Sequence, residues 1–357
     1  MEKTEIINHF QVDRDMTIVE PFGNGHINDT FLVKNTAGEA KYILQRINHT
    51  IFKDVDMLQN NIGTATLHIR EKLVAAGETD IKRKVLNFLP IKSSDKTYFF
   101  DGENYWRVCN FIRGSKTYEE VTPELSYEAG KAFGRFQSML SDLPEGTFGE
   151  IIPNFHNMEF RLKQFQEAIK TNAAGRLSEV QGLVDVLLRR AETYCIQERL
   201  YREGQLMKRV NHCDSKVNNI LFSESGEVLC VIDLDTVMPG FVLSDIGDFI
   251  RTACNTGAED DADLSRIHVN MDIFKAYTRG YLETASVFLT PLEKQLLPYG
   301  GRLLTYMQTV RFLTDYLNGD TYYKIHSPKH NLQRTLAQFK FLQELEDHTA
   351  EMDAFVA

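Results

Sequence analysis

The chain has 357 residues, which is more than one typical hydrophobic core accommodates, and 43% of them are hydrophobic. Two lobes or domains of a globular protein are therefore expected. The formal net charge of −10 argues against a general binder of nucleic acids or anionic membranes, because both partners need a basic surface.

Cysteine usage and the absence of long apolar runs favour a cytoplasmic protein. The five cysteines are scattered, odd in number and without C-x-x-C spacing, so neither a disulfide framework nor a zinc site is indicated. The N-terminal residues contain no apolar core of signal-peptide length, and no uninterrupted apolar run of about 18 residues occurs. We expect a soluble protein of the reducing cytoplasm, monomeric or a weak homodimer, with no membrane partner.

The first part of the chain is predicted to form a sheet preceded by a short amphipathic helix at 4–11. Strand-like runs at 17–22 and 29–35 flank the turn G-N-G-H-I-N, whose Asn-Gly pair is a strong hairpin signal. A glycine-rich hairpin can also bring backbone N–H groups close to phosphate oxygens, as kinase glycine loops do. Gly23 and Gly25 are therefore candidate nucleotide contacts, and a plain hairpin is the alternative.

A third strand is expected at 41–47, and kinase folds carry a phosphate-binding cation on this strand. Arg46 is the candidate here, with Gln45 as the alternative by position. Residues 54–76 have the period of a helix, but they lack a mid-helix acid that would pair with this cation. The usual lysine–glutamate pair is therefore expected to be replaced or absent.

Three further runs, at 85–89, 97–100 and 105–112, are expected to complete a mostly antiparallel sheet, because they are bounded by turn residues and rich in aromatic or apolar residues. The last run leads into a hinge between the two lobes. In that position the backbone at Asn110 and Ile112 would face the edge of an adenine ring.

From residue 122 onward the pattern becomes helical. Helices are expected at 124–141, as a pair between 157 and 202, and at 267–286, 292–318 and 330–353. A sheet followed by helices indicates an α+β fold with the active site between lobes. The chain is thus divided into an N-terminal nucleotide-binding lobe, 1–112, and a larger C-terminal helical lobe, 113–357.

The most informative motif lies between these helices. His212, Asp214, Lys216 and Asn219 give H-x-D-x-K-x-x-N, the spacing by which kinase-type catalytic loops place a base, a phosphate-facing lysine and a magnesium ligand. Each residue alone is more often structural, since Asp and Asn are common in turns. Their combination with the hairpin that follows favours phosphoryl transfer.

That hairpin supplies a second candidate metal ligand. Strands at 220–222 and 228–233 are joined by a turn centred near Gly226, which sets Asn219 and Asp233 opposite each other within one residue of register. Directly opposite residues lie roughly 5 Å apart, a separation that two oxygen ligands can close around one ion. The register therefore predicts a magnesium site.

Three polar residues downstream have open interpretations. Asp245 and Asp248, in S-D-I-G-D-F, are expected to cap the following helix or to brace the catalytic loop. Arg311 lies beside the apolar stripe of 303–317, where it is either a surface arginine at the edge of the stripe or a residue that hydrogen-bonds a polar substrate.

With these motifs identified, the chain resembles the aminoglycoside phosphotransferase and choline kinase superfamily, and within it the N-acetylhexosamine 1-kinases, over nearly its whole length. The matching stretches are GNGHINDTF at 23–31, YILQRIN at 42–48, HCDSKVNNIL at 212–221, IDLDTVMPG at 232–240, DIGDFIR at 245–251 and RFLTDYLNGDTYY at 311–323. The resemblance implies a protein-kinase-like two-lobed fold. It also implies magnesium- and ATP-dependent phosphorylation of the anomeric hydroxyl of N-acetylglucosamine or N-acetylgalactosamine.

Site roles follow from the resemblance position by position. Asp214 is similar to the family's catalytic aspartate, and Asn219 and Asp233 match its magnesium ligands. The positions of its sugar and phosphate contacts correspond to Lys216, His26, Asp233, Arg311 and Tyr323. Two alternatives stay open: a kinase of another small alcohol, such as choline, an amino alcohol, homoserine or an aminoglycoside, and a catalytically inactive nucleotide-binding regulator.

Overall fold

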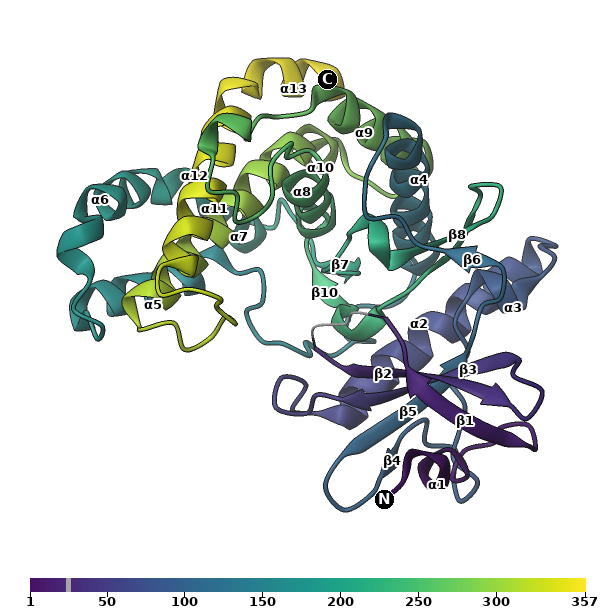
Figure 1. Ribbon diagram of the computed structural model, residues 1–357. Coiled ribbons are helices and arrows are strands. Elements are labelled where there is room, and N and C mark those ends of the chain that lie inside the picture. Colours follow the sequence, from purple (N-terminus) through teal and green to yellow (C-terminus); the bar gives the residue numbers. More distant parts are fainter. Residues whose placement is uncertain (24–26) are drawn as a thin grey trace. The chain divides into compact units, whose positions relative to one another are not determined.

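The computed structural model in Figure 1 describes residues 1–23 and 27–357. The chain forms two compact units, each assembled from separate stretches of sequence. Unit 1 comprises Met1–Tyr118, Met139–Pro153 and Asn218–Pro239, and unit 2 comprises Glu119–Ser138, Asn154–Val217 and Gly240–Ala357. The hairpin after the catalytic loop thus folds with the N-terminal sheet, whereas the expected division at residue 112 assigned it to the helical part.

Unit 1 is built on a five-stranded antiparallel sheet, seen at the purple and blue end of the chain in Figure 1. Its strands, in spatial order, are β1 (Met16–Pro21), β2 (Asp29–Asn35), β3 (Ala40–Ile47), β5 (Tyr105–Asn110) and β4 (Phe99–Phe100). Every pair of neighbours is antiparallel. The predicted sheet of the N-terminal lobe is therefore confirmed.

Helix α1 (Lys3–Ile7) covers part of this sheet and is shorter than expected. Glu2 and Glu5 form a capping box at its start, which satisfies two backbone N–H groups of the first turn. Its isoleucines and the following Phe10 form one core with strand residues, namely Met16, Val33, Leu44, Trp106 and Val108. Phe10 itself makes an isolated bridge with Ile91, so the chain has left the helix before residue 11.

Helix α2 (Val55–Ala75) matches the predicted helix closely. Asp54 caps its N-terminus by accepting a hydrogen bond from the backbone N–H of Met57 at 2.9 Å. Its buried face repeats with helical spacing and includes Leu58, Ile62, Ala65, Ile69 and Leu73. Gly77 follows the C-terminus with a φ of +70°, a left-handed conformation that glycine adopts without steric cost.

The strand expected at 85–89 does not form. A short helix, α3 (Ile81–Lys84), precedes these residues, and only an isolated bridge joins Phe88 to Cys109. The side-chain carbonyl of Asn110 accepts the hydrogen bond from the backbone N–H of Asn87 at 2.6 Å, and Pro90 has no N–H to donate. For both reasons, the backbone hydrogen bonds between residues 85–90 and β5 do not continue as a strand pairing.

The hairpin after the catalytic loop belongs to a second sheet of unit 1. Its strands, in spatial order, are β6 (Ser115–Lys116), β8 (Ile220–Ser223) and β9 (Val228–Val231). Gly226 lies in the turn with a φ of +87°, as the predicted turn requires. The edge of the Tyr118 ring packs against Phe222, with ring centroids 5.1 Å apart.

Unit 2 is mainly helical. Its helices are α4 (Pro123–Leu140), α5 (Met158–Thr171), α6 (Leu177–Tyr194), α7 (Ile196–Arg202), α8 (Val242–Ala253), α9 (Met271–Ala285), α10 (Pro291–Gln295), α11 (Leu297–Leu317), α12 (His330–Asp347) and α13 (Thr349–Val356). The predicted pair between 157 and 202 is three helices. The helices expected at 292–318 and 330–353 each break once, at Leu296 and His348.

Helix α11 is the central element of unit 2 and packs against α5, α8 and α12. Its contact with α8 depends on small residues. A Cβ atom at Gly247 would lie 2.4 Å from the backbone carbonyl oxygen of Gly300, so the two helices approach more closely than side chains would allow. This contact fixes α8, which carries Asp245 and Asp248.

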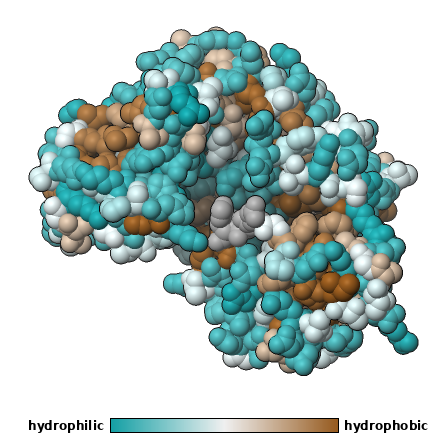
Figure 2. Space-filling view, in the orientation of Figure 1, coloured by the Kyte–Doolittle hydropathy of each residue, from teal (hydrophilic) through white to brown (hydrophobic). Residues whose placement is uncertain are grey.

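The surface in view (Figure 2) is that of a globular protein with mainly polar residues outside. The face drawn in Figure 2 is mostly hydrophilic, with hydrophobic residues in separate patches. None of the described helices combines the length and the apolar character that crossing a membrane requires. The fold is an α+β fold with an antiparallel sheet lobe and a helical lobe, as predicted.

Candidate active site

The catalytic loop begins after the short strand β7 (Arg209–Asn211) and is held by a carboxylate from α8. Asp245 accepts hydrogen bonds from the backbone N–H groups of His212 at 2.9 Å and Cys213 at 2.6 Å. Ser215 donates its hydroxyl hydrogen bond to the backbone carbonyl of Asp245. Cys213 has a φ of +61°, a conformation that is costly for a non-glycine residue and persists only where neighbouring contacts hold it. Of the two expected roles for Asp245, bracing the loop is confirmed.

A second layer of buried polar groups supports this brace. Gln137 on α4 donates hydrogen bonds to Asp245 and Asn211, both at 2.7 Å, and accepts one from the Tyr281 hydroxyl. Burial raises the pKa of Asp245 above its usual range, because a charged carboxylate loses its hydration inside the protein. Three hydrogen bonds to its carboxylate oxygens, from His212, Cys213 and Gln137, compensate part of that cost.

His212 belongs to this support rather than to the reacting groups. Its ring is fully buried and lies edge-on to Phe133 and Phe136, with centroids 5.5 Å and 5.8 Å apart. The first residue of the H-x-D-x-K-x-x-N motif thus packs in the core of unit 2, where it anchors the loop that presents Asp214.

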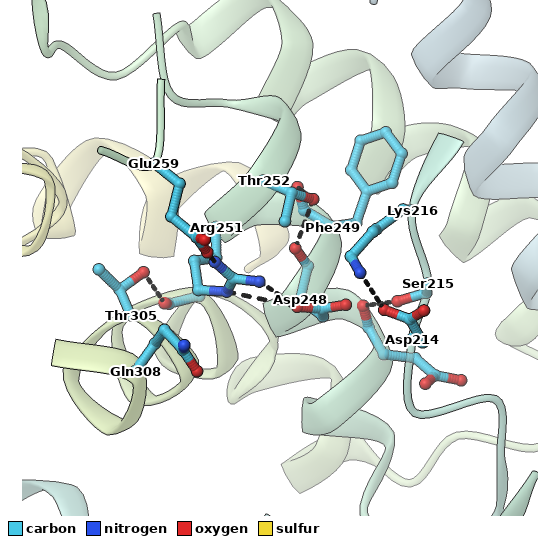
Figure 3. Close-up of polar contacts among 12 residues, drawn as sticks. Asp214, Ser215, Lys216, Asp248, Phe249, Arg251, Thr252, Glu259, Thr305 and Gln308 are labelled. Carbon is cyan, nitrogen blue, oxygen red and sulfur yellow. Dashed lines mark hydrogen bonds and ion pairs between the residues drawn. The ribbon is translucent and has the colours of Figure 1, made fainter. Parts of the chain in front are cut away.

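Asp214 and Lys216 point toward each other on this loop (Figure 3). The Lys216 Nζ atom lies 2.5 Å from a carboxylate oxygen of Asp214. Burial lowers the pKa of Lys216, but the negative charges of Asp214 and Asp248 outweigh burial and raise it above the ordinary value. Lys216 therefore carries a positive charge at neutral pH.

Asp248 forms an ion pair with the buried Arg251, as Figure 3 also shows. Arg251 donates to Asp248 at 2.9 Å and to Glu259 at 2.6 Å. Although burial acts in the opposite direction, the charges of Arg251 and Lys216 lower the pKa of Asp248 below its usual range. Asp248 lies inside α8 and does not cap a helix, so its role is that of a charged partner.

The predicted metal ligands lie at the base of the hairpin in unit 1. Asn219 ends the 3-10 turn Val217–Asn219, and its backbone carbonyl accepts a hydrogen bond from Ile232 N–H at 2.9 Å. Asn219 is thus opposite Ile232, and Asp233 follows one residue later, so the predicted register is confirmed. Asp233 has a φ of +57°, which ends the strand pairing at this residue.

The residues present fit a magnesium ion. Amide and carboxylate oxygens are the ligands that magnesium prefers, and it commonly takes one or two from the protein and the rest from phosphate and water. Among residues 1–23 and 27–357, no group of three or more His, Cys, Asp or Glu side chains could hold a metal ion. A magnesium ion held by Asn219 and Asp233 would therefore take its other ligands from a nucleotide and water.

A buried ion pair next to these ligands was not predicted from the sequence. Arg107 on β5 lies 2.5 Å from a carboxylate oxygen of Asp235, and both side chains are nearly inaccessible, with exposed fractions of 3% and 5%. Asn28 donates a second contact to Asp235. Arg107 also donates to Gln45 at 3.0 Å, and these two residues are directly opposed in the β3–β5 pairing.

The strand register was the signal that could have identified Arg107. The predicted cation, Arg46, has its side chain on the other face of β3, where it forms an exposed ion pair with Asp29 and a hydrogen bond to Asn104 at 3.3 Å. Gln45 shares its face with Arg107. Pairing β3 with β5 residue by residue would have revealed the one cation in the run YWRVCN.

The remaining predicted nucleotide contacts are only partly described. Gly23 has a φ of +70°, whereas Gly25 and His26 lie outside the described residues. The backbone N–H of Asn110 donates to the carbonyl of Asn87 at 3.1 Å, and the carbonyl of Ile112 accepts from the Ser115 hydroxyl at 2.6 Å. The Ile112 side chain is buried.

Arg311 and Tyr323 are brought together at a cavity of about 420 Å³ within unit 2. Gln308 connects them: it accepts a hydrogen bond from Arg311 at 3.1 Å and donates one to the Tyr323 hydroxyl at 3.2 Å. Arg311 therefore lies at the wall of a cavity. Sequence reasoning missed a second arginine in that wall, Arg161 on α5, because its position depends on how α5 packs against α11.

Comparisons with known proteins identify a family and solved structures of similar fold. A family model described as "Phosphotransferase enzyme family" matches residues 18–281. An aminoglycoside phosphotransferase from Alicyclobacillus acidocaldarius has a similar structure, with a TM-score of 0.67 and 12% identity over 99% of this chain and 97% of the other. A microcompartment-associated aminopropanol kinase has a TM-score of 0.58 and 15% identity over 99% and 98%. A Plasmodium vivax ethanolamine kinase has a TM-score of 0.55 and 15% identity over 92% of this chain and 83% of the other.

Proposed function

Because the chain belongs to the phosphotransferase enzyme family, and is therefore a phosphotransferase, we propose that it transfers the γ-phosphoryl group of ATP to the anomeric hydroxyl of an N-acetylhexosamine. The observation that carries the proposal is the pair of Asp214 and Lys216 on a loop fixed by Asp245. A carboxylate base and a protonated lysine, held on one rigid loop, are the groups that phosphoryl transfer requires.

Asp214 orients the acceptor hydroxyl and accepts its proton late in the reaction, because the transition state of phosphoryl transfer is loose and little charge develops early on the nucleophile. Lys216 neutralises negative charge on the phosphoryl group in transfer. Its raised pKa supports this role, since the ammonium stays protonated throughout the neutral range. Before substrates bind, the same ammonium pairs with Asp214.

Asn219 and Asp233 would hold magnesium, which would supply positive charge to offset the negative charge of the nucleotide phosphates. Asp235, fixed by Arg107 and Asn28, keeps the turn that carries Asp233 in place. Gly23, Gly25, Arg46 and the backbone at Asn110 and Ile112 stay as proposed nucleotide contacts.

The proposed acceptor contacts are His26, Asp233, Arg311 and Tyr323. Two of them line one cavity, and a guanidinium beside aromatic rings suits a sugar, which presents both hydroxyl groups and an apolar face. The alternative of a cationic acceptor, such as choline or an amino alcohol, is disfavoured by Arg161 and Arg311 in the same wall. The acceptor can be tested by measuring ADP release with N-acetylglucosamine, N-acetylgalactosamine, choline and ethanolamine. Turnover with choline or ethanolamine alone would reject a sugar as the acceptor.

A further inference from the structure

The cavity of unit 2 is walled by α5, the end of α11 and the loop that follows α11. Six of its lining residues matter here: Arg161, Glu167, Arg311, Asp315, Tyr322 and Tyr323. The Arg311 guanidinium lies 5.6 to 6.0 Å from the ring centroids of Tyr322 and Tyr323 and 5.7 Å from that of Phe155. Arg161 donates to the backbone carbonyl of Phe155 at 2.9 Å. Both arginines are thus tied to the same short segment.

The two positive charges in this wall have no counter-charge of their own. Neither arginine forms an ion pair with any carboxylate among the described residues. The Nε atom of Arg161 is buried without a hydrogen-bond partner. Burial, followed by the charge of Arg311, lowers the pKa of Arg161 to about 10. Two like charges in a partly buried wall are unfavourable unless a negative charge neutralises them.

The carboxylates that line the cavity do not neutralise the two arginines. Asp315 is committed elsewhere: its two oxygens accept hydrogen bonds from the backbone N–H groups of residues 321, 322 and 323 and from the Asn331 side chain. Glu167 is on an exposed turn of α5 and contacts the Thr171 hydroxyl. The wall therefore keeps two unmatched guanidinium groups around a space large enough for a small molecule.

We propose that this cavity binds an anionic group of a small molecule, a carboxylate or a phosphate, between Arg161 and Arg311. Guanidinium groups recognise both anions through paired N–H donors. The proposal rests on the proposed function, because it takes this cavity as the site of the acceptor. It adds that the bound molecule carries a negative charge. The anionic group is carried either by the acceptor sugar or by a separate anion.

Direct binding without nucleotide or magnesium tests the proposal independently of turnover. Isothermal titration calorimetry compares N-acetylglucosamine, N-acetylglucosamine 6-phosphate, glucuronate and inorganic phosphate. The charged sugars are expected to bind at least about tenfold more tightly than N-acetylglucosamine, because a hydrogen bond to a charged group contributes more than a neutral one. Binding of inorganic phosphate as well would assign the site to a separate anion, and binding of charged sugars alone would assign it to the acceptor.

Arg161→Gln is expected to remove most of the preference for charged ligands. Lys163→Gln is the matched control, since Lys163 is exposed on the same helix and the substitution removes the same charge. Arg161→Lys, which keeps the charge, should retain part of the preference, and this variant covers the case that Arg161→Gln does not fold. Equal affinity of neutral and charged sugars, or equal effects of Arg161→Gln and Lys163→Gln, would overturn the proposal. Phosphorylation of N-acetylglucosamine without any anion preference would leave the proposed function intact and reject only the anion site.

Discussion

Asp214 carries the proposed chemistry at the scale of single residues. Asp214→Asn keeps the size of the side chain and removes its capacity to accept a proton. We expect turnover to fall by about two to four orders of magnitude, the usual contribution of a general base, with ATP affinity largely retained. Steady-state kinetics and calorimetric titration of ATP measure the two quantities. Asp185→Asn, at an exposed site of α6, is the control, and near-normal turnover of Asp214→Asn would contradict the assignment.

Lys216 gives a prediction for pH. Its pKa is raised by Asp214 and Asp248 against the effect of burial, so its positive charge, and the stability from this ion pair, persist until the pH exceeds the ordinary lysine value and are lost above the raised pKa. We expect no loss of kcat/KM from this group below about pH 10. Lys216→Arg, whose guanidinium stays protonated, is the comparison. An alkaline loss near about pH 8 to 9 that Lys216→Arg abolishes would contradict the prediction.

At the scale of elements, the strand pairing of β3 with β5 decides which arginine matters near the metal ligands. Arg107→Gln leaves Asp235 buried without its counter-charge, and we expect a loss of about 3 to 5 kcal/mol in the free energy of unfolding. Arg46→Gln breaks an exposed pair with Asp29 and should cost at most about 1 kcal/mol. Urea unfolding measures both.

The same two variants separate their effects on the metal site. Arg107→Gln, if folded, should also raise the magnesium concentration needed for half-maximal activity, because the turn that carries Asp233 loses its anchor. Arg46→Gln should raise the KM for ATP more than it raises the magnesium concentration needed for half-maximal activity, since Arg46 is the proposed phosphate contact. Equal loss of stability in both variants would show that Asp235 does not depend on Arg107.

Elements were predictable where their signals are local. Alternation and turn residues identified β1, β2, β3 and the hairpin of β8 and β9, because a strand boundary needs only the neighbouring residues. The strand at 85–89 failed because a side chain from β5 replaces a backbone partner. The breaks at Leu296 and His348 were missed because neither residue is a strong helix breaker.

At the scale of the whole molecule, the α+β class followed from the order of sheet and helices, and the catalytic loop followed from linear spacing. Residues that act through tertiary contacts were not predictable in this way. Arg107 needs the pairing of β3 with β5, Arg161 needs the packing of α5 against α11, and the support of Asp245 by Gln137 joins residues 108 positions apart. Each lies next to a motif that the sequence did identify.

The most direct test of the central claim is the product formed from N-acetylglucosamine. Purified protein is incubated with magnesium-ATP and N-acetylglucosamine, ADP release is followed, and the product is examined by phosphorus–proton correlation NMR. The account predicts ADP release that depends on the sugar, and a phosphorus nucleus coupled to the anomeric proton. Phosphate on another hydroxyl, or ADP release only with a different acceptor, would contradict it.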